Sequence, residues 1–105
     1  MPTRVEIGQA GEHFVARELA AKGYRTNVDT KASGSTDVEA RGTNTNLRVQ
    51  VKTAISPNSP AALSTEEERN IKALAARHGS EAWEAKVQVD QKLNLVGAIG
   101  WRKLS

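Results

Sequence analysis

Residues 46–53 read NLRVQVKT, and polar and apolar residues alternate through this stretch. Successive side chains of a β-strand project to opposite faces, so the alternation predicts a strand with one apolar and one polar face. The apolar face consists of Leu47, Val49 and Val51, and the polar face of Arg48, Gln50 and Lys52. The simplest interpretation is an edge strand whose polar face is solvated.

Residues 36–41, TDVEAR, alternate in the same way and precede the first stretch across a short polar turn. Two alternating stretches joined by such a turn predict an antiparallel β-hairpin. In a hairpin, the polar faces of the two strands lie on the same side of the sheet. We therefore expect Asp37 and Glu39 to lie near Gln50 and Lys52.

The polar face of this hairpin gathers carboxylates, an amide oxygen and a lysine on one side of a sheet. A hard divalent cation takes oxygen ligands, and a lysine beside it can orient or deprotonate a water molecule. The hairpin therefore predicts a metal-dependent hydrolytic site, in competition with the solvated edge strand.

Length and composition limit the classes to which the protein can belong. With 105 residues, of which 38% are hydrophobic and 26% charged, the sequence predicts one compact domain over residues 1–105 and excludes disordered and fibrous classes. It has no cysteine, so disulfide scaffolds and thiolate metal sites are excluded, while sites with oxygen ligands stay open. No apolar run has the length of a signal peptide or a membrane span, so we expect a cytoplasmic protein without membrane contact.

The charge of the chain favours a polyanionic partner. The net charge is +3 and the isoelectric point is about 9.5. Such an excess favours nucleic acid without requiring it. Aromatic residues make up only 4% of the chain, so it lacks the interleaved basic and aromatic residues of single-strand binders.

Residues 5–22 favour a helix that ends at a glycine. Gln9, His13 and Arg17 recur at every fourth position and form its predicted solvent face. Glu12 lies off this stripe, among apolar neighbours. A carboxylate in such a place costs free energy unless it pairs with a basic residue or binds a metal, and the helical pattern leaves both interpretations open.

The remaining elements are predicted from alternation, turn residues and helix caps. They are a strand at 23–28, a loop at 29–35, a loop at 54–63 with two prolines, a helix at 64–79, and strands at 83–89 and 93–101. Long loops are more often functional than incidental, so we expect the second loop to be a flexible flap that contacts the substrate.

The helix at 64–79 opens with a capping box, in which Ser64 and Glu67 each accept a backbone N–H of the other. Its glutamates at 66–68 are interpreted as a solvated helix start, because acidic side chains are favoured at the positive end of the helix dipole. His78 has no second histidine at helical spacing, so it is interpreted as a residue of the helix end rather than a metal ligand.

Three motifs, GQAGE at 8–12, GSTD at 34–37 and VQVKT at 49–53, resemble those of the PD-(D/E)XK nuclease superfamily. The predicted order of helices and strands also resembles that superfamily over nearly the whole chain. The likeness is greatest to small Holliday junction resolvase-like and Mrr-like members. It implies an α/β fold with the restriction-endonuclease-like three-layer core, a central mixed sheet and the element order αβββαββ.

The resemblance also implies the residues of the site. Asp37 would be the central metal ligand, Gln50 the second ligand through its amide oxygen, and Glu12 a ligand or an outer-shell partner. The backbone carbonyl of Val51 would complete the protein's contribution. Lys52 would orient the attacking water and counter the phosphate charge. Mg²⁺ is the expected cofactor, with Mn²⁺ as a substitute.

Two features depart from the family pattern. Gln50 stands where the family usually has an acidic residue, and no proline precedes Thr36 and Asp37. A neutral amide binds a dication more weakly than a carboxylate does, so weaker metal binding is expected. Glu39 lies two residues after Asp37 on the same predicted face, and strand periodicity suggests that it compensates for the lost negative charge.

The sequence thus predicts a metal-dependent DNA endonuclease, selective for Holliday junctions or other branched DNA. Because cutting two strands requires two sites, a homodimer is expected. The alternatives are a restriction or homing-type duplex endonuclease and a catalytically inactive DNA-binding module on the same fold. A regulatory protein that uses the polar face for protein contacts is a further possibility. The predicted DNA contacts are Lys31, Arg41, Arg48 and Lys86.

Overall fold

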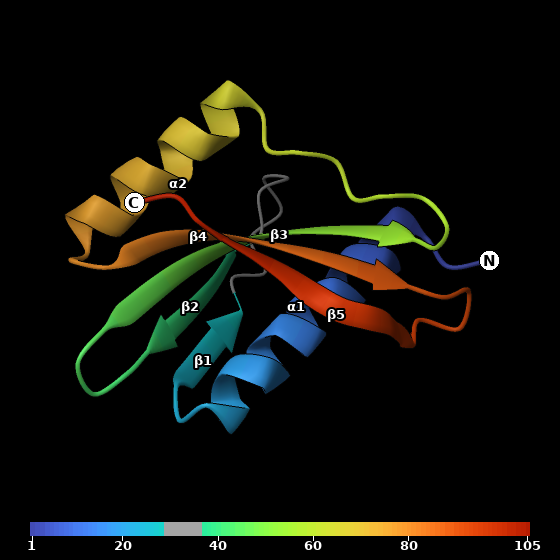
Figure 1. Cartoon of the computed structure of the whole chain (residues 1–105), viewed down its shortest axis with the longest axis horizontal. Helices are drawn as coiled ribbons and strands as arrows, with labels where there is room; N and C mark the ends of the chain where they lie inside the picture. The colour runs from blue at the N-terminus through green and yellow to red at the C-terminus, as the bar shows by residue number, and fades with distance from the viewer. Residues whose placement is uncertain (29–36) are drawn as a thin grey trace.

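The computed structural model describes residues 1–28 and 37–105; the predicted loop at 29–35, with Lys31, lies outside the described residues. The described part contains two helices and five strands. In chain order they are α1 (Arg4–Ala21), β1 (Arg25–Val28), β2 (Asp37–Arg41), β3 (Asn46–Ile55), α2 (Thr65–Arg77), β4 (Glu81–Val89) and β5 (Leu95–Lys103). The predicted element order αβββαββ is confirmed (Figure 1).

The strands form one mixed sheet in the order β1-β2-β3-β4-β5. β1, β2 and β3 are antiparallel neighbours, β3 and β4 run parallel, and β4 and β5 are antiparallel. Parallel strands need a long crossover connection, and here α2 and the segment before it provide that connection. The predicted central mixed sheet is therefore confirmed.

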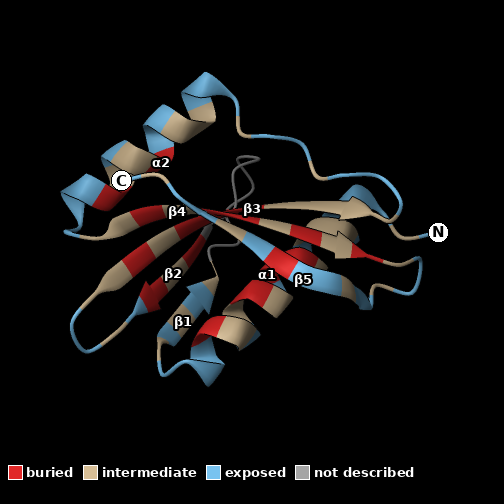
Figure 2. Cartoon of the chain, in the orientation of Figure 1, coloured by how far each residue is buried: buried red, intermediate tan, exposed pale blue. Residues whose placement is uncertain are grey.

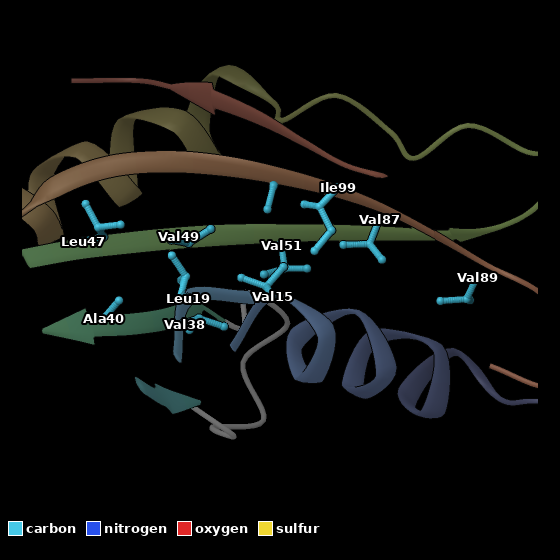
Figure 3. Close-up of a cluster of buried hydrophobic side chains, with 11 residues drawn as sticks. Val15, Leu19, Val38, Ala40, Leu47, Val49, Val51, Val87, Val89 and Ile99 are labelled. Carbon is cyan, nitrogen blue, oxygen red and sulfur yellow. The ribbon is translucent and has the colours of Figure 1, made fainter. Parts of the chain in front are cut away.

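The two helices cover opposite faces of the sheet, which gives the predicted three layers (Figure 1). Val15 and Leu19 of α1 pack on the apolar face of the sheet in the main core, as Figure 3 shows. The strand residues of this core are Val38, Ala40, Leu47, Val49, Val51, Ala85, Val87, Val89 and Ile99. On the other face, Ile71 and Ala75 of α2 form a smaller cluster with Ala82 of β4.

Burial within α1 follows the predicted pattern. Gln9, His13 and Arg17 are exposed, whereas Glu12 and Val15 are buried. Figure 2 shows buried and exposed segments along α1. The helix begins one residue earlier than predicted because Thr3 caps it in a capping box with Glu6. No helix within residues 1–28 and 37–105 is both long and apolar enough to span a membrane.

Several strand boundaries differ from the prediction: β1 begins at Arg25 rather than at residue 23, β4 begins at Glu81 rather than at residue 83, and β5 ends at Lys103 rather than at residue 101. β3 continues through Ile55, two residues into the predicted loop, because Ile55 pairs in register with Val89 of the parallel neighbour β4. β5 begins at Leu95 rather than at residue 93, because Leu93 has a φ of 65° and belongs to the turn. The Asp90 carboxylate closes that turn by accepting the Asn94 N–H at 2.9 Å.

Candidate functional site

The predicted hairpin is present, and its register brings two of the predicted site residues together. Asp37 of β2 lies directly opposite Gln50 of β3, and Glu39 lies opposite Arg48. Asp37 is described by its backbone position alone. Gln50 is only 5% exposed, although it lies on the polar face of the strand. The polar face is therefore not an open solvated surface at this point, which contradicts the edge-strand interpretation.

Lys52 lies two residues after Gln50 on the same face and points toward α2. Its ammonium donates a hydrogen bond to Oε2 of Glu67, with Nζ and Oε2 2.6 Å apart. The side chains of Lys52 and Glu67 are 25% and 26% exposed, so the ion pair is largely shielded from water. The hydrogen bond from Lys52, with a second from the Ser64 N–H, holds the pKa of Glu67 below its usual value.

Glu67 was missed as a site residue, because the acidic start of α2 was interpreted as solvated. That interpretation holds for Glu66, which is exposed. It is wrong for Glu67, and also for Glu68, which pairs with Lys72 and Arg102. A capping box in the sequence identifies the helix start but does not reveal which strand lies beneath it.

Glu39, the possible compensating carboxylate, lies in an arginine cluster. One of its oxygens accepts a hydrogen bond from Arg48 at 2.6 Å, and the other lies 3.3 Å from Nε of Arg41. The Arg41 side chain is 70% exposed, whereas that of Arg48 is 13% exposed. Two of the predicted DNA contacts and the predicted compensating carboxylate therefore belong to one ion-pair cluster beside Gln50.

Glu12 is buried on α1, next to the point where this helix contacts β3. The preceding residue, Gly11, packs so closely on Thr53 that a Cβ atom at position 11 would overlap the Thr53 hydroxyl. Thr53 follows Lys52 and points to the opposite face of β3, where α1 lies. The glycine thus allows α1, with its buried Glu12, to pack closely on β3.

Glu84 of β4 is a second site residue that the sequence did not reveal. It is the register partner of Gln50 on the parallel strand and is only 2% exposed. Its carboxylate accepts hydrogen bonds from Nε of Arg102 at 3.0 Å and from the Leu63 N–H at 3.3 Å. Burial acts to raise the pKa of Glu84, but these hydrogen bonds outweigh it and hold the pKa below its usual value.

Lys86 of β4, a predicted DNA contact, is half-buried and is the register partner of Lys52. Two lysines on neighbouring strands repel each other, and a phosphate between them would relieve the repulsion.

The loop predicted as a flexible flap is held at several points. Its Ser56 N–H donates to the Val89 carbonyl, and its Asn58 carbonyl accepts from Gln88.

The oxygen donors suit a hard cation such as Mg²⁺. Gln50 contributes a buried amide and Glu12 a buried carboxylate, and Asp37 is the register partner of Gln50. Within residues 1–28 and 37–105, no three His, Cys, Asp or Glu side chains group closely enough to hold a metal ion. The described donors therefore fit the cation by type and need the Asp37 carboxylate to complete the set.

The fold is similar to that of a solved nuclease structure. A solved structure with this fold is Hjc of Archaeoglobus fulgidus, a Holliday junction resolvase from an archaeal hyperthermophile. The TM-score is 0.71 with 22% sequence identity, and the likeness covers 92% of this chain and 72% of that chain. No family model matches the sequence, and no curated protein matches it either. The predicted resemblance is therefore confirmed at the level of the fold.

Proposed function

We propose that this protein is a metal-dependent DNA endonuclease that hydrolyses phosphodiester bonds in Holliday junctions or other branched DNA. The observation that carries the proposal is the register of the hairpin. Asp37 lies opposite Gln50, with Lys52 two residues further on the same face, and this arrangement occurs on the fold of a Holliday junction resolvase. The matched structure supplies the substrate class.

The proposed site residues have two roles, which are metal binding and orientation of the attacking water. Asp37, the Gln50 amide oxygen, the Val51 backbone carbonyl and Glu12 would hold Mg²⁺, with Mn²⁺ as a substitute. When bound, the cation stabilises the negative charge that develops on the scissile phosphate. Lys52 would donate a hydrogen bond to the attacking water and counter the charge of the phosphate. Glu39 would serve as a further ligand only after leaving its two arginines.

DNA would bind across the polar face of the sheet. Lys31, Arg41, Arg48 and Lys86 are the proposed phosphate contacts, and the net charge of +3 favours such binding. Arg41 is exposed and Arg48 is buried against Glu39, so Arg41 would contribute more to affinity. A homodimer would present two sites, one for each strand that is cut.

A DNA-binding module without catalysis is the second candidate, and two observations favour it. Gln50 supplies no charge to a metal, and the Lys52 ammonium is already paired with Glu67. Such a module would bind DNA with a strong dependence on salt and without dependence on metal. A duplex endonuclease remains the alternative among catalytic functions.

The test is cleavage of labelled four-way junction, duplex and single-stranded DNA with Mg²⁺ or Mn²⁺. Wild type is compared with Asp37→Ala and Lys52→Ala, and Lys92→Ala, which changes an exposed lysine of the β4–β5 turn, is the control. We expect metal-dependent cutting of the junction that both site variants lose and the control keeps. If the protein binds all three DNAs but cuts none of them with either Mg²⁺ or Mn²⁺, the nuclease proposal fails and the DNA-binding module takes its place.

A further inference from the structure

The segment that leads into α2 is anchored beside the motif strand by the Leu63 backbone N–H, and its own cap holds Glu67. We call residues 63–67 the α2 entry. The Leu63 N–H donates to Oε2 of Glu84 at 3.3 Å, and the Ser64 N–H donates to Oε1 of Glu67 at 3.0 Å. Glu84 is the register partner of Gln50, so the α2 entry is anchored directly beside the motif strand.

Glu67 connects this anchor to Lys52. Its Oε1 accepts the Ser64 N–H of the helix cap, while its Oε2 accepts the Lys52 ammonium at 2.6 Å. The Ser64 hydroxyl in turn accepts the Glu67 N–H at 3.0 Å, which fixes the backbone of the same residue. A charge-assisted hydrogen bond in a shielded site is stronger than an exposed ion pair.

We propose that Glu67 is a positioning residue for Lys52, an inference that rests on the proposed function. A lysine has four rotatable side-chain bonds, and its ammonium is disordered unless a partner holds it. Since Glu67 is itself held at both its backbone and its second oxygen, it is a rigid partner. It fixes the ammonium before substrate binds, and preorganisation of this kind accelerates the chemical step.

The neighbouring Glu68 provides a matched comparison. It carries the same side chain in the same helical turn and is also ion-paired. Its partners, however, are Lys72 of α2 at 3.2 Å and Arg102 of β5 at 3.3 Å. Removing the charge of Glu68 therefore changes the net charge and the start of α2 as removing the charge of Glu67 does. It leaves the contact between Glu67 and Lys52 in place.

The experiment compares Glu67→Gln with Glu68→Gln and Ser64→Ala. The glutamine at 67 can still accept the Ser64 N–H through its amide oxygen, but it loses the ionic contact with Lys52. Ser64→Ala removes the hydroxyl of the cap and leaves both oxygens of Glu67 in place. If Glu67→Gln does not fold, Glu67→Asp replaces it, because the shorter carboxylate keeps its charge near the cap and withdraws from Lys52.

Two readouts are used. The first is the NMR signal of the Lys52 ammonium in the free protein, whose order and proton exchange report whether it is held. The second is the single-turnover cleavage rate of a four-way junction, measured with the dissociation constant for the same DNA. We expect a mobile ammonium and a rate lower by about 10- to 100-fold in Glu67→Gln, with unchanged DNA affinity. Glu68→Gln should resemble wild type, whereas Ser64→Ala, which frees the Glu67 backbone, should lose part of the ammonium order and of the rate.

An ammonium that is equally ordered in wild type and Glu67→Gln would overturn the proposal. A faster rate in Glu67→Gln would also overturn it, since Glu67 would then mask Lys52 rather than position it. If wild type cuts none of the DNAs, the proposed function fails, and the ammonium comparison alone decides whether Glu67 holds Lys52.

Discussion

Gln50 of β3 and Glu84 of β4 are register partners on adjacent parallel strands, and both side chains are buried. The carboxylate at 84 is satisfied by Arg102 and by the Leu63 N–H. A second carboxylate at position 50 would lie beside it, and neighbouring like charges on a sheet repel. The neutral amide at position 50 avoids the repulsion from the buried Glu84 that an acidic residue there would meet.

Replacing Gln50 by glutamate should weaken the fold in the absence of metal and make stability depend on metal. We expect the Gln50→Glu variant to lose about 1 kcal/mol or more of unfolding free energy without Mg²⁺. Mg²⁺ should recover stability in this variant more than in wild type, because a carboxylate binds the cation more tightly. Urea titrations with and without Mg²⁺ measure both effects. Gln9→Glu, on the exposed face of α1, is the control.

Removing Arg102 should leave the buried Glu84 carboxylate without its main partner. We expect Arg102→Ala to lower the free energy of unfolding, because the buried Glu84 carboxylate loses its charged partner, and to do so less than for a fully buried pair because the Arg102 side chain is 54% exposed. Lys103→Ala removes a neighbouring ion pair with Glu81, whose side chain is 35% exposed, and should cost about 0.5 kcal/mol or less. Equal losses in the two variants would show that Glu84 does not depend on Arg102.

The stability of the fold should fall in acid through Glu67 and Glu84. Both have a pKa that is lower in the folded protein than their usual value. Folding therefore favours their ionised forms, so their contribution is complete above the unfolded-state pKa of about 4.3 and is lost as the pH falls through the folded-state pKa.

The Glu67→Gln variant should accordingly show a shallower loss of stability below the unfolded-state pKa than wild type. Chemical denaturation at a series of pH values from neutral to strongly acidic gives the slope. Glu66→Gln, which changes an exposed residue of the same helical turn, should keep the wild-type slope. A wild-type slope in Glu67→Gln would mean that the Lys52 contact contributes nothing to the acid dependence.

A methyl group at position 11 should disturb the contact between α1 and β3. Since a Cβ atom there would overlap Thr53, we expect Gly11→Ala to cost about 1–3 kcal/mol. Gly8 lies one turn earlier in α1 and has open space around its Cβ position. Gly8→Ala should therefore be neutral or stabilising, by up to about 1 kcal/mol.

The melting temperatures of the two variants, measured by circular dichroism, provide the comparison. A shift of α1 away from β3 would also move Glu12, so Gly11→Ala should lose DNA cleavage and Gly8→Ala should keep it. Cleavage retained by a destabilised Gly11→Ala would indicate that the Glu12 position is not needed for catalysis.

The sequence predicted the hairpin correctly, because strict alternation and a short turn favour an arrangement that buries both apolar faces, but it did not give the register, in which Glu39 lies opposite Arg48. It also identified the α2 cap and the burial of Glu12, since both follow from local spacing. It missed the Thr3 cap and the last two residues of β3. The end of β3 depends on pairing with β4, which is distant in sequence.

Local pattern alone therefore determined the elements of this protein, their order and the hairpin that carries Asp37 and Gln50. Only the tertiary structure decided which residues complete the site. Glu84 meets Gln50, and Glu67 meets Lys52, across the parallel crossover between β3 and β4. The pairing of β3 with β4 joins two strands that a long crossover separates in the sequence. No residue spacing within one strand or helix predicts which residues then become neighbours.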